Sequence, residues 1–266
     1  VASTGGVLPE HWQDDLEAAL VAGLDVVSGM HTRLTSFPRL VRAAERHGVR
    51  LVDVRHMNPP FPVGSGRKRS GLRVLTVGTD CALGKKYTAL ALTEALRARG
   101  VPATFRATGQ TGIMIAGSGI AMDALVADFL AGAAEALSPD NAPDHWDVIE
   151  GQGSLYHPAY AAVTLGLLHG SQPDAIVLCH APERTTIEEY PDYPIPPLPE
   201  VIETYLQAGR LTNRRIRCVG LAINSSSLDD AQWAEYRERV QRETGLPVCD
   251  PLRGGVDALA AALLAG

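Results

Sequence analysis

The sequence predicts an α/β fold in which a mostly parallel sheet is covered by helices on both faces. Three observations support this class. Apolar segments of strand length alternate with segments of helical periodicity along nearly the whole chain. Several strand candidates are apolar throughout, which is typical of parallel strands that are buried on both sides. A glycine-rich loop, VGTDCALGKKYT at 77–88, joins one such strand to a helix and has the pattern of a phosphate-binding loop.

The first 58 residues contain a short βαβ series. We expect helices over 10–23 and 38–48, each ending at a glycine, and strands over 24–29 and 49–55. The opening VASTGGVLPEHW has the pattern of a strand end followed by a glycine-rich turn. We therefore interpret this region as the later part of a domain whose first part is absent from the chain.

Residues 59–71 are rich in proline, glycine and basic side chains, and we interpret them as the linker between two domains. A second, larger alternating series fills residues 72–266. Its predicted strands are 73–79, 103–108, 147–151, 174–180 and 215–224. Its predicted helices are 85–100, 122–137, 158–170, 199–209 and 228–245, and an apolar segment, 254–266, closes the chain. Residues 183–199 are rich in proline, so we expect a long loop there.

The composition is that of an ordinary globular protein, with 45% apolar and 20% charged residues. The net charge is −6, and the basic residues are spread along the chain, so we expect no nucleic-acid partner. Four cysteines lie far apart without a CxxC pair, which is typical of reduced thiols and of a cytoplasmic protein. Because no apolar run approaches about 20 residues, we expect no membrane partner and predict a small-molecule ligand.

The glycine-rich loop carries the groups that a phosphate cradle needs. Backbone N–H groups at the start of a helix favour an anion, and Lys85 adds a full positive charge. Five residues separate Gly78 from Gly84, one more than in the common Walker pattern, and Lys86 stands where a magnesium-binding Ser or Thr is usual. We predict no metal site, although Thr88 or Asp80 could replace the missing ligand. The residues predicted to contact the phosphates are Gly78, Thr79, Asp80, Cys81, Ala82, Gly84, Lys85, Lys86, Tyr87 and Thr88.

Polar residues also follow three other predicted strands. Glu150 ends the third strand and is placed to reach a metal or a proton near the phosphates, or to cap a turn. Asn224 ends the fifth strand, where its amide would read a purine edge or close an Asx turn. The segment TGQTGIMIAGSG, 108–119, is expected to be a loop whose exposed N–H groups form a second anion-binding nest.

The motifs GTDCALGKK, IEGQGSLYHP and VGLAIN resemble the dethiobiotin synthetase branch of P-loop proteins. The chain more closely resembles a bacterial and archaeal P-loop family that is associated with D-glutamate N-acetyltransferases and was formerly a domain of unknown function. The segments that carry this resemblance are GLDVVSGMHTRL, DVRH, GTDCALGKKYTAL, ATGQTGIMIAGSGIAMDALVADF and EGQGSLYHPAY. This resemblance covers nearly the whole chain. It implies that residues 1–58 are the C-terminal part of a Rossmann-like domain and that residues 72–266 form a P-loop domain for nucleotide or CoA.

The resemblance implies transfer of an acetyl group from acetyl-CoA to the amine of an amino acid, D-glutamate or a relative. CoA carries a phosphorylated ADP, so a phosphate-binding loop suits it without phosphoryl transfer, and Lys86 then adds a second cation. The family commonly has Met-Thr-Thr after the loop lysine, whereas this chain has Lys-Tyr-Thr, which leaves ATP use open. Two alternatives therefore remain: an ATP–Mg²⁺-dependent ligase or kinase of the dethiobiotin synthetase type, and a nucleotide-binding regulatory module. We further expect a homo-oligomer, either a dimer or a tetramer.

Amine acylation needs a base and donors for an oxyanion. The catalytic candidates are Glu150, His157 and His180, and the first two are close enough in sequence to converge. Arginine binds carboxylates in bidentate fashion, so the substrate-binding candidates are Arg106, Gln110, Thr111, Arg33, Arg55 and Arg184. Cys81 could carry an acyl group, but no histidine lies near it in sequence, and we expect it to be structural.

Overall fold

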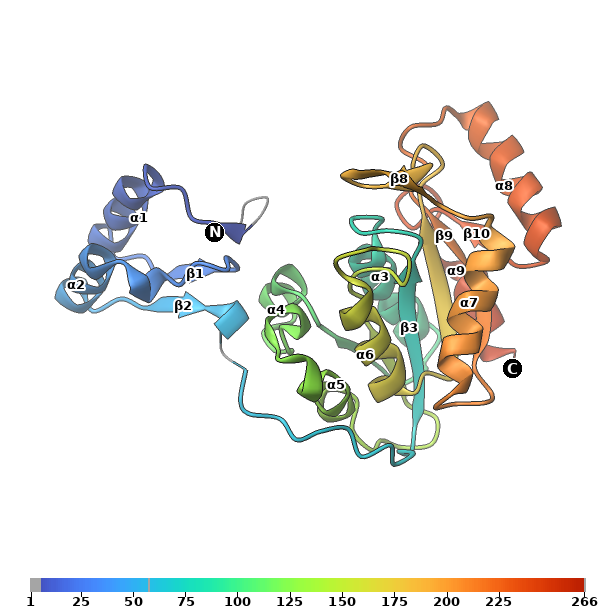
Figure 1. Ribbon diagram of the computed structural model, residues 1–266, viewed down its shortest axis with the longest axis horizontal. Coiled ribbons are helices and arrows are strands. Elements are labelled where there is room, and N and C mark those ends of the chain that lie inside the picture. Colours follow the sequence, from blue (N-terminus) through green and yellow to red (C-terminus); the bar gives the residue numbers. More distant parts are fainter. Residues whose placement is uncertain (1–5, 57, 266) are drawn as a thin grey trace.

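The computed structural model describes residues 6–56 and 58–265 and arranges them as two α/β units joined by an extended segment (Figure 1). The predicted α/β class, with a parallel sheet covered on both faces, is confirmed. The predicted opening strand end falls on residues 1–5, which lie outside the described residues. No helix in the described part of the chain is long and apolar enough to cross a membrane.

The N-terminal unit is a small βαβ layer. Two parallel strands, β1 (Val26–Ser28) and β2 (Leu51–Asp53), pair directly, and α1 (Trp12–Val21) and α2 (Pro38–His47) pack together on them. Leu20, Leu34 and Leu40 are fully buried between these elements. The predicted strand over 49–55 stops at Asp53 because Val54–His56 forms a single 3₁₀ turn.

The large unit contains a six-stranded sheet with the order β10-β9-β6-β3-β5-β4, and all its paired strands are parallel. The strands are β3 (Leu72–Gly78), β4 (Ala103–Arg106), β5 (Trp146–Ile149), β6 (Ala175–His180), β9 (Arg217–Ile223) and β10 (Val248–Cys249). The chain leaves β3 toward one edge and later returns to its other side. The carboxyl end of β3 therefore lies where the strand order reverses, which is where open parallel sheets bind ligands.

Helices cover both faces of this sheet because alternate strand residues point to opposite sides. Leu75, Leu178 and Leu221 belong to the core under α5 (Leu130–Leu137), α6 (Ala161–Ser171), α7 (Leu198–Arg210) and α8 (Asp230–Thr244). Val74 and Val177 belong to the core under α3 (Lys85–Ala98) and α9 (Asp257–Leu264). Figure 1 shows the two helical layers on either side of the strands.

Four segments differ from the sequence prediction. The expected nest at 108–119 contains a short helix, α4 (Gln110–Ala116), which follows an extended Gly109 and ends at left-handed Gly117. The expected helix over 122–137 is broken into two 3₁₀ turns before α5 begins. The proline-rich loop holds an antiparallel hairpin of β7 (Thr186–Ile187) and β8 (Tyr190–Pro194), where prolines are tolerated because the pair has free edges. The two-residue β10 is too short to give a periodic signal.

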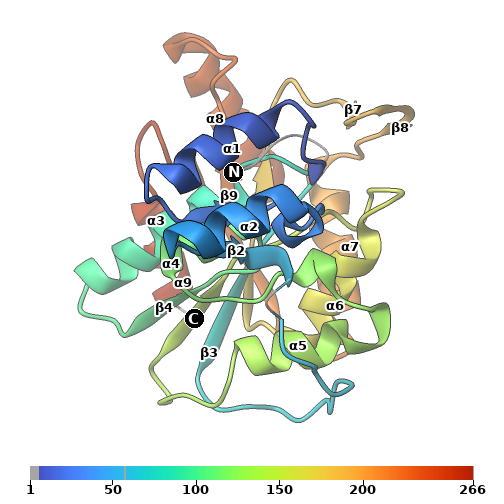
Figure 2. The ribbon, with the colours of Figure 1, turned by 90° about the vertical axis from the view of Figure 1, so that its left-hand side faces the viewer.

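The two units contact each other beside α4 and the 3₁₀ turn at 122–124. Arg55 is buried and forms an ion pair with Asp123. Asn58 donates to the carbonyl oxygen of Ala121 at 2.9 Å and accepts from its N–H at 3.2 Å. Figure 2, which looks from the N-terminal side, shows α1 and α2 in front of the large sheet. These contacts bring the N-terminal unit next to the ligand-binding edge of the large unit's sheet.

Candidate functional site

The glycine-rich loop turns from β3 into α3 and forms one wall of a cavity of about 420 Å³. Gly84, just before the helix, has φ +91°, and Ala82 also has a positive φ of 55°. The other wall comes from residues 109–111 and 150–153. The predicted residues that line this cavity are Cys81, Ala82, Gly84, Lys85, Lys86, Tyr87, Gln110, Thr111 and Glu150.

Lys85 is buried at the floor of the loop, and its ammonium donates to the carbonyl oxygen of Asp80 at 2.7 Å. Burial lowers its pKa, because the charged form loses solvation. Gly151 makes this packing possible: a Cβ there would lie 1.7 Å from the carbonyl oxygen of Thr76 and 3.1 Å from the Lys85 side chain. A phosphate bound in the cavity would give the buried Lys85 ammonium a negatively charged partner.

Lys86 also lines the cavity, and its ammonium lies 4.7 Å from the ring centre of Tyr87. Thr88 donates its hydroxyl to the carbonyl oxygen of Gly84 at 3.1 Å. This bond occupies the Thr88 hydroxyl proton within the helix, while Lys86 supplies a second cation beside the loop.

Glu150 follows β5 and is held by the beginning of α4. Its carboxylate accepts N–H bonds from Thr108 at 2.9 Å and Gly109 at 3.2 Å. Burial raises the pKa of Glu150, and these two N–H groups partly oppose the shift. Gly112 leaves room for the carboxylate in this position, because a Cβ at residue 112 would lie 2.2 Å from it and would displace it. The result is a buried carboxyl at the wall opposite the lysines.

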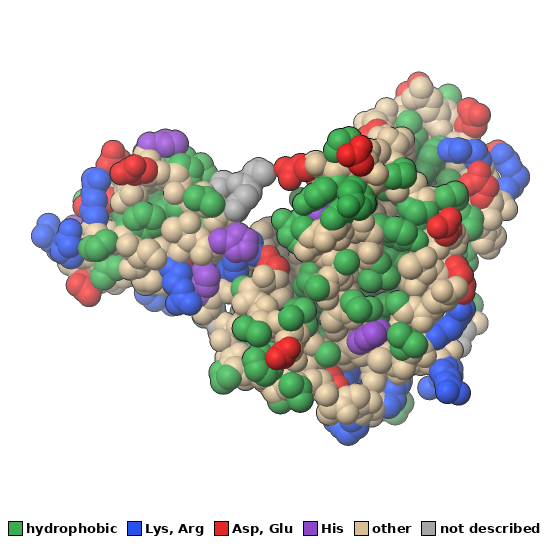
Figure 3. Space-filling model, viewed as in Figure 1, with side chains coloured by type: hydrophobic (Ala, Val, Ile, Leu, Met, Phe, Trp, Pro, Cys, Tyr) green, Lys and Arg blue, Asp and Glu red, His purple; other side chains and the backbone are tan. Residues whose placement is uncertain are grey.

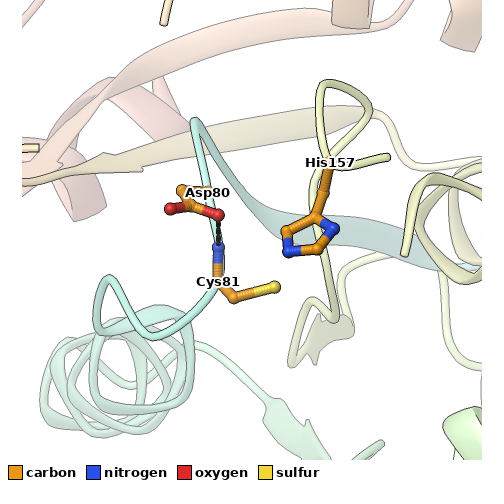
Figure 4. Close-up of side chains that lie close together, drawn as sticks. All are labelled: Asp80, Cys81 and His157. Carbon is orange, nitrogen blue, oxygen red and sulfur yellow. Dashed lines mark hydrogen bonds between the residues drawn. The ribbon is translucent and has the colours of Figure 1, made fainter. Parts of the chain in front are cut away.

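The side chains of Asp80, Cys81 and His157 lie close together at the loop (Figure 4). Their carboxylate, thiol and ring-nitrogen atoms lie within 4.8 Å of one another. No histidine lies near Cys81 in sequence, but the fold brings His157 to it from 76 residues away. Burial raises the pKa of the Cys81 thiol, so this thiol stays protonated near neutral pH.

Neighbouring groups donate hydrogen bonds to Asp80 and to His157 of this cluster. Asp80 is fully buried and accepts from Arg184 at 2.6 Å and from the N–H of Glu188 at 2.8 Å. The Arg184 guanidinium therefore disfavours an added metal ion. His157 accepts from the N–H of Ala159 at its Nδ1 atom, 3.1 Å away, so a neutral ring carries its proton on Nε2. His157 is placed as a donor toward Cys81.

His180 lies beneath the loop, at the end of β6. Its Nδ1 atom and the Thr79 hydroxyl are 2.9 Å apart. Burial lowers the pKa of His180 to about 4, so the ring is neutral at physiological pH. This hydrogen bond attaches the first turn of the loop to the neighbouring strand.

The predicted substrate arginines lie away from the loop cavity. Arg106 donates to the buried carboxylate of Asp147 at 2.7 Å, and Arg184 is paired with Asp80. Arg55 is buried at the contact between the two domains, whereas Arg33 is exposed on the N-terminal domain. None of these four lines the loop cavity among the described residues, and their proposed role in carboxylate binding stays a prediction.

A second, smaller cavity of about 130 Å³ adjoins the loop near the end of β9. Asn224, Asp250 and Leu252 line it together with Tyr87 and Thr88. The Asn224 amide oxygen also accepts from the N–H of Ser226 at 3.2 Å, as in the predicted Asx turn. The two interpretations of Asn224 are therefore compatible, since the same side chain closes a turn and faces a cavity.

Residues that hold this site in shape were missed by the sequence analysis. Thr76 accepts from the N–H of Gly151 at 3.0 Å, and Ser154 donates to the carbonyl oxygen of Thr79 at 3.0 Å. Gln152 donates to the Thr108 hydroxyl at 3.1 Å. The glycines at 151 and 153 were a usable signal for close backbone approach, but polar partners so far apart in sequence gave none.

Comparisons with known proteins identify the family of this chain. A P-loop domain of unknown function, the C-terminal part of DUF1611, matches residues 62–260, and the Rossmann-like N-terminal domain of DUF1611 matches residues 1–57. The chain belongs to the DUF1611 family. The crystal structure of a DUF1611 family protein from Anabaena variabilis is similar, with a TM-score of 0.92 and 40% identity, over 100% of this chain and 78% of that chain.

Two relatives of this DUF1611 protein carry a named activity. A D-glutamate N-acetyltransferase of a Pseudoalteromonas species is 48% identical over 262 residues, which cover 98% of this chain and 79% of the relative. A D-glutamate N-acetyltransferase of Tritonibacter scottomollicae is 47% identical over 265 residues, which cover 98% of this chain and 80% of the relative. The family resemblance predicted from the sequence is confirmed.

Proposed function

We propose that the protein is an N-acetyltransferase that moves an acetyl group from acetyl-CoA to the amine of D-glutamate. The observation that carries this proposal is the similarity to two D-glutamate N-acetyltransferases at 48% and 47% identity, each over 98% of this chain. At this level of identity the two relatives belong to the same family, and their named activity is the simplest one to propose for this chain.

The geometry of the loop supports a donor that contains phosphates and adenine. Lys85 and Lys86 bring two cations to the loop cavity, where backbone N–H groups at the beginning of α3 also favour an anion. The adjoining cavity beside Asn224 offers an amide to a purine edge. CoA carries both groups and ends in the thiol that bears the acetyl group, so these two cavities would hold the donor while its thioester extends away from the loop.

Acetyl transfer forms a C–N bond and breaks a C–S bond. The attacking amine must lose a proton, and the carbonyl oxygen becomes negative before the thiolate leaves and takes up a proton. Glu150 is the candidate acceptor for the amine proton, because burial raises its pKa toward the range of a useful base. The Nε2–H of His157, on the Cys81 side of the loop, is a candidate donor to the oxyanion.

One observation favours the ATP–Mg²⁺-dependent alternative. Glu150 lines the same cavity as Lys85, and a carboxylate beside phosphates is a common magnesium ligand. Against this alternative, Lys86 occupies the position of the usual hydroxyl ligand and would repel a metal ion. The acetyltransferase proposal needs no such ion.

The proposal is tested by incubating the protein with acetyl-CoA and D-glutamate, following release of free thiol, and identifying N-acetyl-D-glutamate by mass spectrometry. L-Glutamate and D-alanine serve as controls for chirality and for the second carboxylate. We expect product with D-glutamate. Absence of the acetylated amino acid at millimolar D-glutamate would contradict the proposal.

A further inference from the structure

A third cavity, of about 380 Å³, lies between the N-terminal domain and the helices α5 and α6. It shares Cys81, Gln152 and Gly153 with the loop cavity, so the two spaces meet at these residues. The loop cavity carries the lysines that suit phosphates. A thioester that extends from phosphates in the loop cavity would therefore reach the shared border and face the third cavity.

The lining of this cavity combines polar groups at one end with an apolar wall. The N-terminal domain contributes His31 to the lining, and the P-loop domain contributes Asp123. Asp123 is neutralised by the buried Arg55, which also donates to the carbonyl oxygen of Gly29 at 3.0 Å. Leu125, Leu130 and Val163 form the apolar wall. Figure 3 shows histidine side chains and basic (Lys or Arg) side chains where the N-terminal domain meets the larger one.

We propose that this interdomain cavity binds the amino acid that accepts the acetyl group. Its amine would lie at the border formed by Cys81 and Gln152, its methylene groups would contact the apolar wall, and a carboxylate would accept the ring N–H of His31. The proposal rests on the proposed acetyltransferase function. It also gives the N-terminal domain a role, since the acceptor site is incomplete without His31.

The ion pair between Arg55 and Asp123 positions this site. Arg55 belongs to the N-terminal domain and Asp123 to the P-loop domain, and the bond between Gly29 and Arg55 ties the pair to the segment that carries His31. Because Arg55 is buried, loss of Asp123 would leave a buried charge unpaired, and loss of Arg55 would remove the link between the two domains. Tests of the cavity are therefore better made at His31 and on the exposed face of α6.

Two variants test the proposal without disturbing a core. His31→Ala removes the carboxylate donor, and His47→Ala, on the exposed last turn of α2, is its matched control. Ala162→Trp fills the cavity from α6, and Leu165→Trp, 38% exposed on the same helix, is the control for the added indole. We expect KM for D-glutamate to rise about tenfold in His31→Ala, and further in Ala162→Trp, with KM for acetyl-CoA unchanged in both.

The outcomes separate this inference from the proposed function. A change in KM for acetyl-CoA instead would mean that the cavity holds the donor's pantetheine arm, and unchanged constants in both variants would equally overturn the inference. If the wild-type protein makes no N-acetyl-D-glutamate, the proposed function fails, and calorimetric titration with D-glutamate decides the cavity. Binding that Ala162→Trp abolishes and Leu165→Trp retains supports the site, whereas absence of binding to the wild type contradicts it.

Discussion

The phenolic hydroxyl of Tyr205 donates a hydrogen bond of 2.7 Å to the carbonyl oxygen of Gly78, the last residue of β3. The same hydroxyl accepts from the N–H of Leu155 at 3.1 Å. Tyr205 lies on α7 and is fully buried, and burial raises its pKa to about 12, so it stays a neutral donor. One side chain thus links both loops of the candidate site to the helix layer behind them.

We expect Tyr205→Phe to lower the free energy of unfolding by about 1–3 kcal/mol, because the buried carbonyl of Gly78 and the partly buried N–H of Leu155 both lose their partner. Urea denaturation measures the change. Tyr156→Phe is the matched control, since its hydroxyl bonds the half-buried Thr204 hydroxyl at 2.7 Å on the same helix. A loss in Tyr205→Phe no larger than in Tyr156→Phe would refute the linking role.

Lys85→Ala is expected to weaken acetyl-CoA binding about ten- to a hundredfold, as the loss of a charge-assisted contact to phosphate predicts. Titration calorimetry with CoA and with acetyl-CoA measures the effect. Lys68→Ala, which removes an exposed cation paired with Asp174, is the control for net charge. Unchanged affinity for every adenine-containing ligand would remove the phosphate-binding assignment of the loop.

Glu150→Gln is expected to reduce turnover at least a hundredfold, because general-base catalysis contributes about 10²–10⁴. The melting temperature should hold or rise at neutral pH, because the amide oxygen can still accept from Thr108 and Gly109 while the cost of a buried charge disappears. In the wild type, the pKa of Glu150 is raised by burial. As the pH is lowered, turnover should therefore begin to fall at a higher pH than it would with an ordinary glutamate as the base. Normal turnover in the variant would remove Glu150 from the mechanism.

The lowered pKa of His180 predicts how the free energy of unfolding depends on pH. Its pKa is lowered from 6.5 to about 4 in the folded protein, so the unfolded chain takes up a proton that the folded state resists. The stabilisation is therefore complete above pH 6.5 and is lost as the pH falls toward 4, by about 2 kcal/mol between pH 7 and pH 5. His180→Asn keeps an acceptor for Thr79 without titrating, and its unfolding free energy should fall less over this interval. If the unfolding free energy changed with pH equally in both proteins, groups other than His180 would account for the pH dependence.

The sequence predicted the sheet and its ligand edge because apolar strands, glycine helix stops and the glycine-lysine junction are local signals. It missed α4 because two glycines and a neighbouring glycine-serine run hide a seven-residue helix. It also missed the hairpin at 186–194, whose two prolines are typical of loops. In each case, tertiary contacts outweigh the local preference.

The candidate site was predictable only where its residues follow strand ends. Glu150 and Lys85 line one cavity as their positions indicated. The approach of His157 to Cys81 depends on the return of a loop after β5, and periodicity carries no such information. The strand end that holds Arg106 was identified correctly, but the sequence did not reveal that Asp147 on the neighbouring strand already occupies its guanidinium.

The most direct test of the central claim is acetyl transfer in the presence of a chelator. The protein is incubated with acetyl-CoA and D-glutamate, with and without EDTA and without ATP, while free thiol and N-acetyl-D-glutamate are quantified. Lys86 in place of the magnesium ligand predicts that both products form at the same rate with and without EDTA. Absence of transfer, together with magnesium-dependent formation of ADP from ATP and a carboxylic acid substrate, would contradict the acetyltransferase and support the ligase.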